Sequence, residues 1–224
     1  MLEHGFHEGS IGSVWWNKQL HIQGLGQRVG LFEHGGAQRL TGGDLFRLAQ
    51  PASRSDATDN DVLTFLWHVL ARGTGPSQRG NRQRIEAFVP PAARERNVAR
   101  LKEANSHARD GDVAAAYRCL IRRGGGQIRG LGPAFFTKLL YFSSEGTPGT
   151  RCLILDARVA ESLAEAGWSS LPCSSRNRYS YNWFTTTYDS YCKLLREWAE
   201  TASNSRGSEV WPDEIERALF DRGA

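Results

Sequence analysis

The sequence has few cysteines, and none of them stands in a metal-binding spacing. Its four cysteines, Cys119, Cys152, Cys173 and Cys192, are far apart and form no CxxC pair. This argues against a compact zinc or iron–sulfur site, so we expect no metal and no other cofactor. Three of them, Cys119, Cys152 and Cys192, stand among apolar residues and are predicted to be core thiols. The six histidines form no metal-ligand spacing either, and no role is assigned to them: His4, His7, His21, His34, His68 and His107.

Long apolar runs are also missing. No stretch reaches the roughly 20 apolar residues that a membrane-spanning helix needs. The opening "MLEHGFHEGS" is polar and carries acids, unlike a signal peptide. We therefore expect a soluble, cytoplasmic monomer with no membrane partner. The 224 residues suffice for one core or for two small lobes that share a cleft.

Lysine is scarce, whereas arginine is abundant. The chain has 4 lysines and 24 arginines, and these 28 basic residues exceed the 24 acidic ones by a net charge of +4. Arginine suits phosphate because its flat guanidinium presents paired donors. The arginines gather in three stretches, at 72–84, 118–129 and 176–178. A merely solvated basic surface is one interpretation, and a polyanionic partner is the other; the clustering favours the partner.

Helical periodicity covers most of the chain. Residues 1–40 alternate in "SVWWNKQLHI" and "QRVGLFEH", which predicts short strands or an irregular N-terminal segment. Residues 41–224 are predicted to form an α-helical core in two lobes. Asp59 or Asn60 is the expected cap of the first long helix. The expected helices lie near 41–49, 61–72, 82–89, 90–111, 112–123, 133–142, 156–167, 185–202 and 211–222.

The stretch "RGLGPAFFTKLLYF" (129–142) places a Gly-Leu-Gly turn directly before a strongly apolar segment. Such a turn exposes backbone N–H groups, and the positive end of the next helix dipole adds to them, so together they can bind a phosphate. Pro133 fits the first turn of that helix, where its missing N–H costs least. A plain helix stop is the alternative. Beyond it, "LILDAR" sets one acid, Asp156, inside an apolar stretch.

In this order of motifs the chain resembles the helix-hairpin-helix DNA glycosylases, nearest the 8-oxoguanine DNA glycosylase branch and its small prokaryotic relatives. The residues that carry the resemblance are "GLG" at 130–132, ahead of a buried helix, and "DARV" at 156–159, which fits the family's D-x-x-V motif. It is clearest over residues 59–165. The resemblance implies a mainly α, helix-hairpin-helix glycosylase fold, with the helix-hairpin-helix at about 113–142.

The resemblance implies that Asp156 is the catalytic residue. A carboxylate near the sugar stabilises the positive charge that develops as an N-glycosidic bond breaks, and it can orient water. A helix N-cap is the alternative role, compatible with the first because the family's aspartate also stands at a helix start.

The family's members that also cleave the strand carry a lysine two residues after the hairpin's second glycine. Here that residue is Ala134. Lys138, one turn later, is interpreted as a structural or snorkelling lysine. The resemblance therefore implies base removal by water, without AP-lyase activity.

An enzyme of this kind flips out its base, which requires a wedge and an aromatic pocket. The stretch "FLWHVLARGTGPSQRGNRQRIEAF" resembles the family's wedge-bearing helix and loop. The wedge candidates are Gln78, Arg79 and Asn81, with an ordinary loop as the alternative. Most aromatic residues are core, so one or two candidates are expected to contact a base. The pocket candidates are Trp16, Trp67, Tyr179, Tyr181 and Trp183.

DNA contacts are expected from the hairpin and from nearby arginines. These residues are Gly130, Leu131, Gly132, Arg129, Arg79, Arg82, Arg158, Arg176 and Arg178. A monovalent cation at the hairpin is compatible with this arrangement.

The sequence therefore predicts a monofunctional glycosylase that acts on double-stranded DNA containing a modified base. Its setting is either base-excision repair or defence against phage with modified bases. A non-enzymatic helix-hairpin-helix DNA-binding protein, with Asp156 only a cap, is the alternative. A third interpretation, an all-α scaffold with no DNA role, predicts no salt-dependent DNA binding.

Overall fold

The computed structural model describes residues 9–30, 39–144, 152–171 and 183–222. Within these ranges the chain is mainly helical with almost no strand, which confirms the expectation of a mainly α fold. The strands β1 (Gly9–Ser10) and β2 (Arg39–Leu40) pair antiparallel. The helices are α1 (Ser13–Ile22), α2 (Gly42–Ala52), α3 (Asp59–Thr74), α4 (Asn81–Glu86), α5 (Pro91–Asp110), α6 (Val113–Arg118), α7 (Pro133–Ser143), α8 (Ala157–Glu165), α9 (Thr185–Arg206) and α10 (Pro212–Arg222), with 3₁₀ turns η1 (Gly75–Ser77) and η2 (Arg122–Gly124).

The N-terminal segment holds a helix where the alternating pattern predicted a strand. In α1, Trp16 and Leu20 are completely buried, whereas Val14 and Ile22 are exposed. Residues four apart lie on the same face of a helix, so the buried pair defines its inner face. The strand prediction over "SVWWNKQLHI" was wrong because it gave the exposed apolar residues the same weight as the buried ones.

Two capping boxes fix where α2 and α3 begin. In each box a threonine hydroxyl accepts the N–H of an aspartate three residues on, and the aspartate carboxylate accepts the threonine's backbone N–H. The pairs are Thr41 with Asp44 and Thr58 with Asp61. The cap of α3 is therefore Thr58, and the prediction of Asp59 or Asn60 was wrong by one or two residues. Each cap contributes about 1 kcal/mol.

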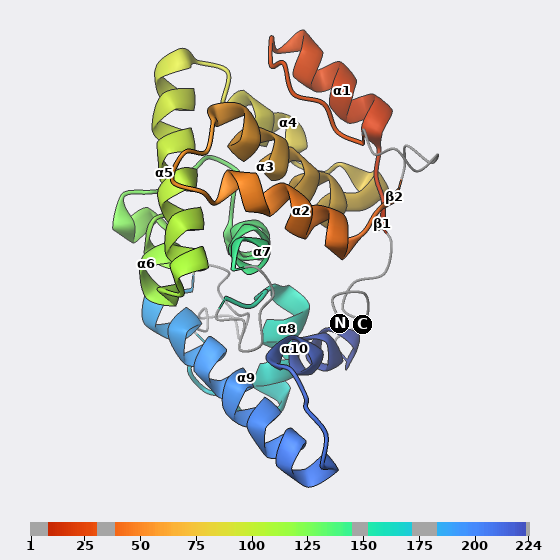
Figure 1. Cartoon of the computed structure of the whole chain (residues 1–224), viewed down its shortest axis with the longest axis vertical. Helices are drawn as coiled ribbons and strands as arrows, with labels where there is room; N and C mark the ends of the chain where they lie inside the picture. Colours follow the sequence, from red (N-terminus) through yellow and green to blue (C-terminus); the bar gives the residue numbers. More distant parts are fainter. Residues whose placement is uncertain (1–8, 31–38, 145–151, 172–182, 223–224) are drawn as a thin grey trace.

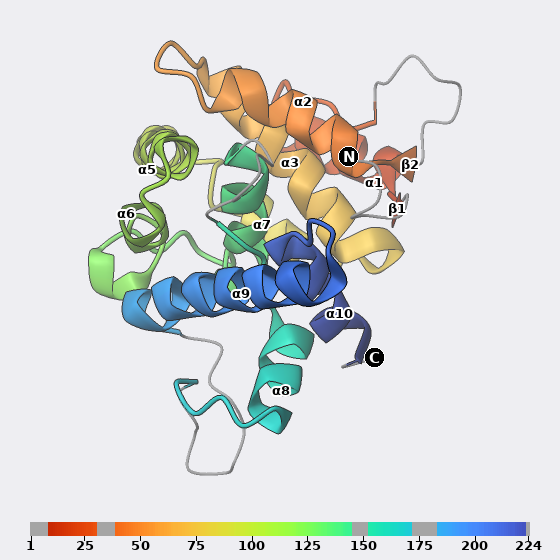
Figure 2. The same cartoon turned by 60° about the horizontal axis from the view of Figure 1, so that its bottom comes forward.

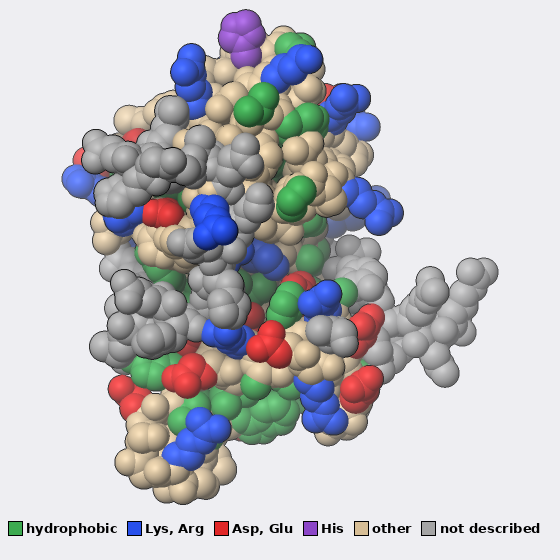
Figure 3. All heavy atoms as spheres, turned by 90° about the vertical axis from the view of Figure 1, so that its right-hand side faces the viewer, with side chains coloured by type: hydrophobic (Ala, Val, Ile, Leu, Met, Phe, Trp, Pro, Cys, Tyr) green, Lys and Arg blue, Asp and Glu red, His purple; other side chains and the backbone are tan. Residues whose placement is uncertain are grey.

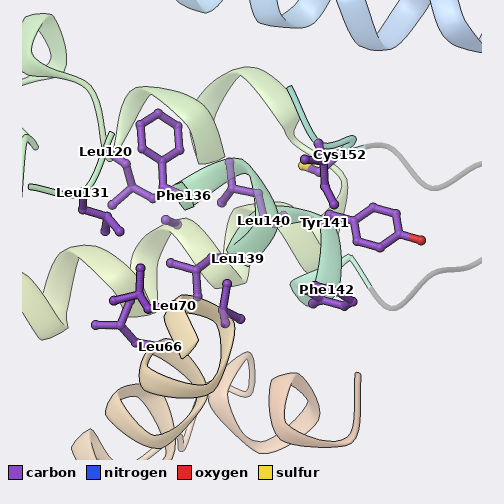
Figure 4. Packing of buried hydrophobic residues seen from close by; sticks show 14 of the residues in the cluster. Leu66, Leu70, Leu120, Leu131, Phe136, Leu139, Leu140, Tyr141, Phe142 and Cys152 are labelled. Atoms are coloured by element: carbon purple, nitrogen blue, oxygen red, sulfur yellow. The ribbon is translucent and has the colours of Figure 1, made fainter. Parts of the chain in front are cut away.

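The most apolar helix, α7, lies at the centre of the molecule. Figures 1 and 2 show it between α2 and α3 on one side and the C-terminal helices on the other. In the close-up of Figure 4, Leu66 and Leu70 of α3 lie against Leu139 of α7, and all three are buried. Each buried leucine stabilises the fold by about 1.5–3 kcal/mol. Because α7 follows the Gly-Leu-Gly turn directly, this packing also anchors the turn.

One continuous cluster of buried apolar side chains runs from α1 to α10. The predicted boundary after residue 40 and the two lobes stay predictions. None of the described helices is long and apolar enough to cross a membrane.

Candidate active site

The segment that leads into α8, residues 152–155, forms neither helix nor strand, and its backbone bonds to side chains. The Tyr188 hydroxyl donates to the Leu153 carbonyl at 2.7 Å and accepts the Leu153 N–H at 3.2 Å. The Tyr191 hydroxyl donates to the Ile154 carbonyl at 2.6 Å. Both tyrosines are fully buried on α9, and burial raises the pKa of each well above its usual value. They therefore stay protonated and able to donate.

Two further side chains hold the same segment from α7 and α10. Thr137 Oγ1 accepts the Leu155 N–H at 3.2 Å, and Glu216 Oε2 accepts the Ile154 N–H at 3.1 Å. Both side chains are buried. An unpaired N–H here would cost about 1–3 kcal/mol. The next residue, Asp156, is thus placed by contacts from three helices.

Asp156 uses one carboxylate oxygen as a helix cap and directs the other elsewhere. Its Oδ1 accepts the N–H of Arg158 at 3.1 Å and of Val159 at 3.3 Å. Its Oδ2 lies 3.5 Å from Nζ of Lys138, and the Asp156 side chain is 15% exposed. Asp156 therefore caps α8 through Oδ1, and Oδ2 is left to act in a reaction.

The place of Lys138 beside Asp156 was not foreseen from the sequence. Its Nζ also donates to the Ala134 carbonyl at 3.1 Å. Helical side chains lean towards the N-terminus of their helix, so this lysine carries its amine back along α7 towards Ala134. Because this direction is general for helical side chains, the sequence alone could have placed the Lys138 amine near Ala134, the position of the family's lysine.

The Gly-Leu-Gly turn, together with Ile128 and Arg129, forms a tight hairpin (residues 128–132) ahead of α7. The Leu131 N–H donates to the Ile128 carbonyl at 3.0 Å, and Gly130 has φ of +78°, where side chains are disfavoured. Gly132 has an ordinary φ of −85°, and a Cβ there would meet nothing within 4 Å. Pro133 begins α7 as predicted. The backbone thus favours glycine at 130, whereas the space beside 132 is open.

Leu131 anchors the hairpin in the core. It is 4% exposed and lies beside Leu120 in Figure 4. Its expected DNA contact can therefore come only from its backbone, because the side chain points inward.

The helix that precedes the hairpin, α6, ends at Arg118, whereas the sequence predicted a helix over 112–123.

A buried arginine joins the hairpin to the loop after α3. Arg84 Nε donates to the Gly130 carbonyl at 2.8 Å. Its Nη1 donates to the Arg79 carbonyl at 2.8 Å and to Asn81 Oδ1 at 2.7 Å. Its guanidinium carbon lies 3.8 Å from the centre of the Phe135 ring, which is a cation–π contact. The two loops predicted to contact DNA are thus fastened to each other.

The end of α3 lies against the same helix as Lys138. A Cβ on Gly73 would be 3.5 Å from the Phe135 ring and 3.6 Å from Cδ of Lys138. Residues 73–84, the hairpin, Lys138 and Asp156 therefore form one neighbourhood, called here the Asp156 site.

A comparison with known protein families covers almost the whole chain. The family described as "Putative 8-oxoguanine DNA glycosylase OGG-like protein" matches residues 2–220. The chain belongs to this OGG-like family. The match extends well beyond residues 59–165 and confirms the resemblance to the 8-oxoguanine glycosylase branch. No curated protein and no solved structure matches the chain.

Of the wedge candidates in this OGG-like chain, Arg79 is exposed and Asn81 is buried. Asn81 has no exposed surface, and its Nδ2 donates to Thr74 Oγ1 at 2.8 Å. Since Arg84 binds its Oδ1, both ends of the amide are used. Asn81 holds the loop in shape, and its role as a wedge stays a prediction that would require it to leave both of these partners.

Gln78 has the one positive φ found among the described non-glycine residues, +51°. Its side chain lies against Gly12, where an added Cβ would be 2.0 Å from the Gln78 Nε2. Such backbone strain persists only where surrounding contacts impose it. Its role as a wedge, like that of Arg79, stays a prediction.

Exposed arginines surround the Asp156 site. Arg79, Arg82, Arg129 and Arg158 are exposed, and the Arg158 guanidinium lies 4.9 Å from the Phe220 ring centre. On the face shown in Figure 3, basic side chains occur over the whole height, whereas most acidic ones lie in the lower half. The DNA contacts of these arginines stay predictions. Arg176 and Arg178 lie outside the described residues.

Three of the five pocket candidates are core residues. Trp16 and Trp67 have no exposed surface, and their ring centroids are 6.1 Å apart. Trp183 is 2% exposed. None of these rings presents a face to a base in this structure, and their roles in a base pocket stay predictions. Trp16 and Trp67 pack on the inner faces of α1 and α3, and Trp183 is buried just before α9. Tyr179 and Tyr181 lie outside the described residues.

One cluster in the described part of the OGG-like chain could hold a metal ion, which histidine spacing did not suggest. Glu103 and His107, one turn apart on α5, and Cys119 bring ligand atoms within 4.8 Å of one another. Burial, followed by the Glu103 charge, raises the pKa of the Cys119 thiol to about 11.

The cysteines predicted to be core thiols differ in burial. Cys119 is only partly buried, whereas Cys152 and Cys192 are buried as predicted. Cys173 lies outside the described residues.

Proposed function

We propose that this OGG-like chain is a monofunctional DNA glycosylase, which hydrolyses the N-glycosidic bond of a modified base flipped out of double-stranded DNA. The observation that carries the proposal is the second oxygen of Asp156. It lies beside Lys138 on a side chain that is 15% exposed, in the same neighbourhood as the hairpin and the loop fastened by Arg84. A residue that served only as a helix cap would not need Lys138, the hairpin and the loop after α3 around it.

The proposed chemistry needs a fixed carboxylate. As the bond between the base nitrogen and C1′ breaks, positive charge grows on the sugar, and Oδ2 of Asp156 stabilises it. A water oxygen then bonds to C1′, and its proton passes to Asp156 or to the departing base. The product is an abasic site in an intact strand.

Lys138 favours a second candidate, a glycosylase that also cleaves the strand. Its Nζ lies 3.5 Å from Asp156 Oδ2. As a free amine it could bond to C1′, release the base and form a Schiff base, from which elimination breaks the strand. We place hydrolysis first because Ala134 stands where the family's nucleophilic lysine would be, and Lys138 Nζ is held one turn later by the Ala134 carbonyl and Asp156.

The test uses duplexes with 8-oxoguanine opposite cytosine, a panel of other damaged DNAs, and phage DNAs with modified bases. Mass spectrometry should find a released base. The strand should break only after alkali, and borohydride should trap no protein–DNA adduct. A trapped adduct that disappears in Lys138→Ala would establish the second candidate instead.

Asp156→Asn should reduce base release by about 10²–10³-fold and leave DNA binding in place. The matched control is Asp112→Asn, because Asp112 caps α6 through the Ala115 N–H and is exposed. Asparagine caps helices well, so both variants should fold. If the two variants release base equally well, Asp156 is only a cap. If no DNA yields a base, the non-enzymatic DNA-binding protein becomes the better interpretation.

The DNA that yields a base also separates the two proposed settings. Release from damaged DNA supports repair, and release from phage DNA supports defence. The cytoplasmic location, the monomer and the lack of a cofactor stay predictions.

A further inference from the structure

Glu216 is a buried acid that the proposed chemistry does not use. It lies on α10, is 5% exposed, and accepts the Ile154 N–H at 3.1 Å. No ion pair joins Glu216 to a cation within the described ranges. Buried glutamates are rare unless they are paired. This one lies behind the segment that leads into Asp156.

Charged and titratable groups face Glu216 from each helix packed around it. Burial is the main influence and raises its pKa to about 8; the hydrogen bond from the Ile154 N–H and the charge of Lys138 lower it, and the charges of Asp156 and Asp213 raise it. Tyr141 of α7 and Tyr191 of α9 also interact electrostatically with Glu216. At neutral pH the carboxyl is therefore mostly protonated and uncharged.

We infer that Glu216 is a positioning residue of the Asp156 site: it holds the Ile154 backbone and so sets where Asp156 Oδ2 meets Lys138. The catalytic part of this inference rests on the proposed function. The site has one ammonium and two carboxyl groups. An uncharged Glu216 leaves Lys138 to pair with Asp156 alone.

Ionised Glu216 would disturb this arrangement. It would compete for Lys138, be repelled by Asp156, and carry a fully buried charge. The Ile154 N–H would still bond to the carboxylate, so the disturbance comes from the competition for Lys138 and the repulsion of Asp156. Base release should therefore fall as the pH rises past about 8, the pKa of Glu216.

Two variants separate shape from charge. Glu216→Gln keeps an acceptor for the Ile154 N–H and cannot ionise, whereas Glu216→Ala removes the acceptor. The matched control is Glu161→Gln, since Glu161 is exposed on α8. In hydrogen exchange, Glu216→Ala should speed exchange of the Ile154 amide and of the Asp156-capped amides by roughly tenfold or more, the effect of losing one buried hydrogen bond. Glu216→Gln and Glu161→Gln should leave the exchange of these amides unchanged. Unchanged exchange in a folded Glu216→Ala would overturn the inference.

The second measurement is the pH dependence of unfolding. The Glu216 pKa is raised from 4.5 to about 8, so between these values the folded chain holds a proton that the unfolded chain has lost. Through Glu216, stability therefore falls as the pH rises across this window. Glu216→Gln should remove this fall, and Glu161→Gln should keep it. This test stands even if Glu216→Ala does not fold, and identical curves for wild type and Glu216→Gln would refute the uncharged carboxyl.

The third measurement is base release in single turnover, on a DNA that the wild type cleaves. Glu216→Ala should be slower by about tenfold or more with similar DNA affinity. Glu216→Gln should be close to wild type at neutral pH and should lack the alkaline fall. A Gln variant that is as slow as the Ala variant would count against the inference. If the wild type releases no base, the proposed function fails, while exchange and unfolding still decide the role of Glu216.

Discussion

At the residue scale, Asp156 serves structure and chemistry with different oxygens. Its Oδ1 caps α8, and its Oδ2 faces Lys138. An aspartate that caps a helix is held by that helix, so its second oxygen has little freedom to move. This explains why a helix start suits a residue that must stabilise charge at a fixed point on a sugar.

Lys138 can be tested by a pair of substitutions. If it only holds Asp156, Lys138→Arg should keep most base release, since arginine retains the charge. Lys138→Ala should lower release by about tenfold, the effect of losing one charge-assisted hydrogen bond. The measurement is single-turnover base release with and without alkali. Loss of activity in both variants, together with loss of a borohydride adduct, would instead identify a nucleophile.

Sequence reasoning found Asp156 because its motif is local, and missed Arg84 and Glu216 because their contacts are not. The Arg84 bond to Gly130 spans 46 residues, and the Glu216 bond to Ile154 spans 62. Nothing in the spacing of polar residues shows which of them a later helix will bury. In "RGNRQR", for example, the sequence does not distinguish the exposed Arg82 from the buried Arg84.

At the scale of elements, helices with a strong start or stop signal were predicted well. Pro133 and the glycine turn place the start of α7 at its observed residue. α1 was missed because it has no side-chain cap and exposes two of its apolar residues. Thr58 was missed as a cap because three polar residues follow it, and only geometry selects among them.

The two glycines of the hairpin should respond differently to substitution. Gly132→Val should fold normally, since its backbone is extended and its surroundings are open, but it should weaken DNA binding by blocking phosphate approach. Gly130→Ala should lower the free energy of unfolding by about 1–2 kcal/mol because of its positive φ, and its Cβ would also lie 3.1 Å from Cγ of Arg84. Chemical denaturation and DNA affinity distinguish the two. Unchanged affinity in Gly132→Val would make the hairpin only a helix stop.

The link between the hairpin and the loop after α3 should depend on Arg84. Arg84→Met keeps much of the side-chain volume and removes the bonds to Gly130, Arg79 and Asn81. We expect a loss of about 1–3 kcal/mol in stability and faster proteolysis of the loop at 75–80. Arg82→Met is the control, because Arg82 is exposed on the same helix and should affect DNA binding without changing stability. Equal stabilities of the two variants would show that the link is not required.

At the scale of the whole molecule, three distant parts of the chain meet around α7. The end of α3 with Arg84 of α4, the hairpin and the start of α8 are separated in sequence, and each contacts α7 or its first turn. Family membership fits this arrangement, since the match covers residues 2–220 as one unit. A net charge of only +4 cannot by itself attract DNA strongly, so the position of the arginines matters more than their number.

DNA binding should therefore be salt-dependent and local to the Asp156 site. Phosphate contacts release counterions, so affinity should fall steeply as salt rises. Arg129→Ala, beside the hairpin, should weaken binding and reduce the slope of log affinity against log salt by about 1. Arg206→Ala is the control: it removes the same charge from an exposed site at the end of α9 and should leave the slope unchanged. The measurement is duplex affinity over a range of salt concentrations. A flat dependence in the wild type would remove DNA as the partner, and equal slopes for the two variants would mean that the basic surface acts as a whole.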